Sequence, residues 1–82
     1  MKTKRGNDVP KDIAHAILAD ETAIQGFEQM PPSHQEEFLS YILEAKLPET
    51  RARRIKLSVA AIKKWYADRA ERMKKSRMAK RA

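Results

Sequence analysis

The sequence predicts an all-α fold: a small domain of four helices in which the last helix is long and basic. Alanine, leucine, glutamate and lysine, which favour helix, dominate the 82 residues, and only two glycines occur. No stretch shows the sustained alternation of apolar and polar residues that is typical of strands. Apolar residues instead recur at three- and four-residue spacings, and prolines separate the stretches from one another.

The first two predicted helices are short. The first begins near Val9-Pro10, because proline fits the first helical position, where its missing N–H is not needed. The second covers residues 20–30 with Asp20 as its N-cap, and it ends at Pro31-Pro32. We expect both to have one apolar face, made by Ile13, Ile17 and Leu18 in the first helix and by Ala23, Phe27 and Met30 in the second.

The third predicted helix starts in one of two ways. Ser33 and Glu36 have the spacing of a capping box, whereas Pro32 is suited to be the first helical residue. The helix then runs to about Lys46. Its apolar stripe is wide, which predicts packing on two sides; the stripe consists of Phe38, Leu39, Ile42, Leu43 and Ala45.

The fourth predicted helix begins at Pro48 and is the longest. Ile55, Val59, Ile62 and Tyr66 recur at spacings of four, three and four, which defines one helical face, and Trp65 flanks it. Beyond residue 68 the apolar positions thin out among basic residues. We therefore divide the chain into a basic flexible N-terminus (1–8), a helical domain (9–68) and a basic helix extension or tail (69–82).

The composition limits the functions that the chain can carry. There is no cysteine, which rules out disulfides and thiolate metal sites and predicts a cytoplasmic location. His15 and His34 are the only histidines, and neither has acidic residues at ligand spacing. There is no glycine-rich phosphate loop and no nucleophile elbow. The sequence thus predicts a non-enzymatic protein with no cofactor, no metal and no evident small-molecule substrate.

The segment EAKLPETRARRI, residues 44–55, predicts a charged corner between the third and fourth helices. We expect Arg51 or Arg54 to pair with Glu37, Glu44 or Glu49 and to lock this corner. The alternative is an anion site, in which the arginines lie beside the N–H groups of a helix start. A helix–turn–helix DNA reader is disfavoured because acidic residues surround the turn. The residues of the predicted structural corner are Glu44, Lys46, Pro48, Glu49, Thr50, Arg51, Arg53 and Arg54.

The same segment carries a family resemblance over about residues 9–62. It resembles the bacteriocin-protection, YdeI or OmpD-associated family, whose hallmark joins an SH pair to EAK, ETR and RRI. The matching residues are Ser33, His34, Glu37, Ile42, Glu44, Ala45, Lys46, Glu49, Thr50, Arg51, Arg53, Arg54 and Ile55. The resemblance implies a helical segment that often follows a separate β-rich domain, here standing alone. It also implies a role in tolerance of bacteriocins or envelope stress, with an unidentified protein as the partner.

The C-terminal tail is the second candidate for function. Of the net charge of +7, residues 69–82 carry +6 and residues 1–9 carry +2, so the middle of the chain is close to neutral at −1. A cationic tail of this kind binds polyanions by releasing counterions, without reading sequence. Its partner would then be nucleic acid, and less so an anionic membrane, because few apolar anchors accompany the charges. The alternative is a solvated basic helix end or a frayed terminus without a binding role. The candidate residues are Arg69, Arg72, Lys74, Lys75, Arg77, Lys80 and Arg81.

Overall fold

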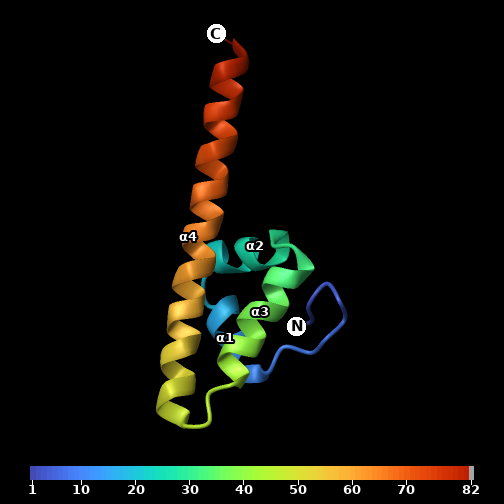
Figure 1. Cartoon of the computed structure of the whole chain (residues 1–82), viewed down its shortest axis with the longest axis vertical. Coiled ribbons are helices and arrows are strands. Elements are labelled where there is room, and N and C mark those ends of the chain that lie inside the picture. Colours follow the sequence, from blue (N-terminus) through green and yellow to red (C-terminus); the bar gives the residue numbers. More distant parts are fainter. Residues whose placement is uncertain (82) are drawn as a thin grey trace.

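Four helices make up the fold in a computed structural model that describes the backbone of residues 1–81 and the side chains of residues 1–72 (Figure 1). They are α1 (Lys11–Leu18), α2 (Glu21–Gln29), α3 (Pro32–Leu43) and α4 (Pro48–Arg81). The first three pack against the N-terminal half of α4, and the rest of α4 projects beyond them (Figure 1). The described residues form no strand, so the predicted all-α fold with a long last helix is confirmed.

Local chemistry explains where the short helices begin. Asp20 caps α2 as predicted, because its Oδ1 accepts hydrogen bonds from the backbone N–H groups of Thr22 (2.9 Å) and Ala23 (3.3 Å). Pro10 is the N-cap of α1, whereas we expected it to be the first helical residue. Both helices start with an acidic side chain in the first turn, where it interacts favourably with the helix dipole.

The bounds of α3 correct two expectations. The helix begins at Pro32 with Pro31 as its N-cap, so the capping-box alternative is wrong. Its expected acid, Glu36, instead accepts hydrogen bonds from Thr3 and Asn7. The helix also ends at Leu43 rather than near Lys46, since proline at position 48 restarts the chain as α4 and leaves a short loop before it.

The core lies where α1, α2 and α3 meet the N-terminal half of α4. Ile13 and Ile17 face it as predicted, but Leu18 is 56% exposed and does not join them. Leu43 is likewise 51% exposed, so the buried stripe of α3 is narrower than predicted. The buried apolar residues of the described chain are Val9, Ile13, Ile17, Ala23, Phe27, Met30, Leu39, Ile42 and Ile62.

Two helices approach each other closely where α2 crosses α4. A Cβ on Gly26 would lie 2.8 Å from Ile62 Cγ2, 3.1 Å from the Ile62 carbonyl oxygen and 3.2 Å from Tyr66 Cβ. Two polar contacts flank this crossing: Lys63 Nζ lies 2.7 Å from Asp20 Oδ2, and the Tyr66 hydroxyl donates to Gln25 at 2.6 Å. Glycine at position 26 therefore allows α2 to pack directly on the α4 backbone.

The N-terminal segment folds back on α3. Gly6 adopts a φ of 87° at a turn, and the backbone groups of Val9 and Met1 are hydrogen-bonded. The Lys4 N–H donates to the side chain of Gln35, which is buried and donates in turn to the Phe27 carbonyl. The division of the chain at residue 8 stays a prediction, although in this structure the segment is in contact with α3.

Candidate functional site

The predicted corner is the loop between α3 and α4. Glu44 is the C-cap of α3; its N–H donates to the Ser40 carbonyl, and the N–H of Ala45 donates to the Ile42 carbonyl. The Arg51 N–H donates to the Leu47 carbonyl at 2.9 Å, which closes the first turn of α4 with Pro48 as its first residue. The segment therefore ends one helix and immediately starts the next.

Arg51 connects α4 to α1. Its Nε lies 2.6 Å from Asp12 Oδ2 and its Nη2 lies 2.9 Å from Asp12 Oδ1, which is the two-pronged geometry of a strong arginine–carboxylate pair. The hydrogen bonds from Arg51 lower the pKa of Asp12 below its usual value. We expected Arg51 or Arg54 to pair with Glu37, Glu44 or Glu49; the acid paired with Arg51 is none of these and lies 39 residues earlier.

Arg54 connects α4 to α3. Its Nη1 donates to the Tyr41 carbonyl at 2.7 Å, and the guanidinium carbon lies 4.7 Å from the centre of the Tyr41 ring. One of the expected acids, Glu44, is also near, with 3.9 Å between Arg54 Nη1 and Glu44 Oε2. The sequence predicted the Glu44 carboxylate as a partner of Arg54, but not the ring and the backbone carbonyl of Tyr41.

The remaining corner residues are directed toward solvent. Lys46, Glu49 and Arg53 are exposed, and Thr50 is half-buried. Two leucines share this exposure, since Leu43 is 51% and Leu47 is 60% exposed. The corner thus exposes apolar and charged side chains, while Arg51 and Arg54 connect α4 to α1 and α3.

A shallow acidic depression lies beside the N-terminal segment on α3. It has a volume of about 440 Å³ and is lined by Arg5, Ser33, Glu36, Glu37, Ser40, Tyr41 and Glu44. Hydrogen bonds from Asn7 and Thr3 lower the pKa of Glu36. Glu36 therefore holds the N-terminal segment and is no free acid or base.

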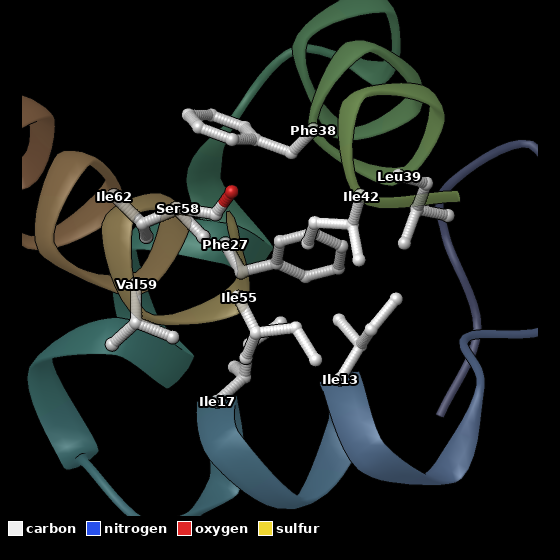
Figure 2. Close-up of a pocket in the computed structure, with 10 residues that line it drawn as sticks. All are labelled: Ile13, Ile17, Phe27, Phe38, Leu39, Ile42, Ile55, Ser58, Val59 and Ile62. Carbon is white, nitrogen blue, oxygen red and sulfur yellow. The ribbon is translucent and has the colours of Figure 1, made fainter. Parts of the chain in front are cut away.

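A small apolar cavity of about 10 Å³ lies inside the core between all four helices (Figure 2). The Ser58 hydroxyl is the one polar group drawn among its lining residues, and it has no hydrogen-bond partner in the described part of the chain. The volume suits about one water, which would need two or more polar partners to be held there. The cavity has neither the size nor the chemistry of a ligand site.

The second candidate region begins where α4 leaves the body. Trp65 is half-buried against the core, with the His34 ring edge-on at 6.5 Å and the Arg69 guanidinium 5.4 Å from its ring centre. Arg69 and Arg72 are exposed. The other predicted tail residues (Lys74, Lys75, Arg77, Lys80 and Arg81) belong to α4, but their side chains lie outside the described residues.

Neither a metal-ligand cluster nor a membrane-spanning helix occurs among the described residues. The described chain contains no group of three or more histidine, cysteine or acidic residues arranged to hold a metal. None of the helices in this part of the chain combines the length and apolar character needed to cross a membrane.

Comparison with known proteins gives one match. The family model for bacteriocin-protection, YdeI or OmpD-associated proteins matches residues 8–64, which is more than half of the chain. No curated protein and no solved structure matches. The matched range covers α1, α2, α3 and the packed part of α4, and it ends just before Trp65.

Proposed function

The chain belongs to the bacteriocin-protection, YdeI or OmpD-associated family, and on that premise we propose that it is a non-enzymatic interaction module. Its partner is a protein, and the interaction contributes to tolerance of bacteriocins or envelope stress. The family description names OmpD, so OmpD is the first partner to test.

The observation that carries this proposal is the corner surface, which we define as Leu43, Lys46, Leu47 and Arg53. Its two leucines are more than half exposed, Lys46 is exposed next to Leu47 in the chain, and Arg53 is exposed on α4. Exposed apolar patches mark interaction sites, and arginine is enriched among the residues that dominate protein interfaces. The arginines at positions 51 and 54 hold the joint rigid, which reduces the entropy lost on binding.

The proposal is tested by binding of the purified chain to OmpD and by affinity capture from the native cell. The double variant Leu43→Ser and Leu47→Ser should lose the partner, because it removes the apolar part of the corner surface. Leu18→Ser is the matched control, since Leu18 is similarly exposed and lies on α1, outside the corner surface. Equal recovery of a specific partner by both variants would contradict the role of the corner surface.

A second function is favoured by the course of α4. The helix continues past the body (Figure 1), and Arg69 and Arg72 are exposed on it, whereas the residues that line the acidic depression belong to the N-terminal segment, α3 and its C-cap. We infer that the chain is also an accessory nucleic-acid-binding protein that acts through residues 69–82. Their charge of +6 supports salt-sensitive binding that does not depend on sequence.

This second function is tested with mixed-sequence DNA and RNA at several salt concentrations, with and without residues 69–82. The buried core ends at Ile62, so the shortened chain keeps its packed residues. We expect binding by the full chain, weakening as salt rises, and none by the shortened chain. Absence of binding at low salt would remove the hypothesis, and binding that survives the deletion would reassign it to Arg51, Arg53 and Arg54.

A further inference from the structure

We propose that Trp65 and Arg69 form a stacking site for an unpaired nucleobase, so that the polyanion bound along α4 is a single-stranded nucleic acid. The proposal deepens the second function above and rests on it. It assigns to α4 a definite point of contact in addition to a general positive charge.

The first support is that one face of α4 changes from apolar to cationic along the helix. At about 100° per residue, Trp65, Arg69 and Arg72 lie within roughly 60° of one another. Ile62, one turn before Trp65, is on the same side and is buried in the core. The face that packs on the body therefore becomes cationic where the body ends, and the tryptophan lies at the boundary.

The second support is how the tryptophan is held. Trp65 packs against the core, with the His34 ring edge-on at 6.5 Å, so its indole is fixed in orientation. The Arg69 guanidinium lies 5.4 Å from the ring centre. Bases stack on aromatic rings and on arginine planes in single-stranded complexes, and this stacking tolerates any sequence. A rigid ring carrying an exposed arginine is suited to that contact.

The nature of the site distinguishes between polyanions. A base in a duplex is enclosed by its neighbours, whereas an unpaired base is free to leave its strand and stack. An anionic membrane calls for apolar anchors beside the cations, and the described residues after Trp65 on this face are the exposed Arg69 and Arg72. Asp68, about 60° from Trp65, lies at the edge of this face, and Glu71, about 120° away, lies off it. A single strand therefore fits best.

The experiment uses the full chain and oligothymidine, with a mixed-sequence duplex of equal length as comparison. Trp65 is the only tryptophan, so its fluorescence reports on this position alone. We expect oligothymidine to quench the fluorescence and to bind more tightly than the duplex. Loss of one stacked base should weaken binding at least about fivefold.

Arg69→Lys is the decisive variant, because lysine keeps the charge but lacks the flat guanidinium. We expect it to weaken oligothymidine binding, while the control Arg5→Lys, at an exposed arginine of the N-terminal segment, has no effect. Trp65→Leu should weaken binding as well, and its circular dichroism and melting curve show whether it is folded. Arg69→Lys needs no such safeguard, since Arg69 is exposed.

The outcomes separate this inference from the function on which it rests. Equal binding of strand and duplex, no quenching and an unaffected Arg69→Lys variant would overturn the stacking site but leave polyanion binding through the tail intact. No binding of either nucleic acid would overturn both. Binding to anionic vesicles without binding to oligothymidine would overturn both in favour of a membrane partner.

Discussion

The replacement Gly26→Ala tests whether the crossing of α2 and α4 depends on direct backbone contact. In an isolated helix this change would stabilise by about 1 kcal/mol, because alanine is the better helix former. Here the new methyl would lie 2.8 Å from Ile62 Cγ2 and 3.1 Å from the Ile62 carbonyl oxygen. Ile62 is 1% exposed and β-branched, so its side chain has little freedom to move away.

The magnitude follows from two opposing terms. Overfilling a packed core costs about 1–3 kcal/mol, and the upper part of that range applies because one of the crowded atoms belongs to the α4 backbone. Subtracting the gain in helix propensity leaves a loss of about 1–2 kcal/mol. For a domain of this size the melting temperature should fall by roughly 4–16 °C, as measured by circular dichroism during thermal unfolding.

The control for this experiment is Glu28→Ala, an exposed position on the same helix. It should leave the melting temperature almost unchanged. In an Ile62→Ala background the nearest contact is removed, so Gly26→Ala should cost less than it does in the native chain. A Gly26→Ala variant as stable as the native protein would refute the conclusion that α2 packs directly on the α4 backbone.

Three further results are expected. Arg51→Ala should lower stability by roughly 0.5–1 kcal/mol at neutral pH, a small value because the pair is partly exposed. Arg51 holds the pKa of Asp12 below its usual 3.8. The stabilisation is therefore complete above pH 3.8 and is lost as the pH falls through the lowered pKa. A difference in stability between the native chain and Arg51→Ala that persists in strong acid would contradict this. Ser58→Ala should raise the free energy of unfolding in urea by about 1 kcal/mol, because the buried hydroxyl has no partner among the described residues, and a decrease would contradict this. Arg54→Ala should lower the melting temperature more than Arg53→Ala, because only the former is hydrogen-bonded to α3 in the described structure, and equal values would remove this role.

Much of the fold could be predicted from local patterns. The cap at Asp20 needed only its own side chain and two N–H groups within three residues. The start of α4 at Pro48 likewise depends on the geometry of proline and a short loop. Such features were predictable because the interacting groups are close in sequence.

The apolar residues were harder to place. Ile17 and Leu18 are adjacent and equally apolar, yet one is buried and the other is 56% exposed. Leu39 and Leu43 on α3 differ in the same way, at 4% and 51% exposed. Periodicity gives the side of a helix that is apolar, but the width of the buried stripe depends on where the neighbouring helices lie.

For the candidate sites, the residue types followed from the sequence: a corner rich in arginine, a basic end and the absence of cysteine. The residues that these side chains contact became known from the folded structure. Arg51 is paired with Asp12, 39 residues away, and Trp65 has His34 at its edge. Charge is a property of each residue and can be read from the chain, whereas a contact between distant residues exists only once the helices have packed.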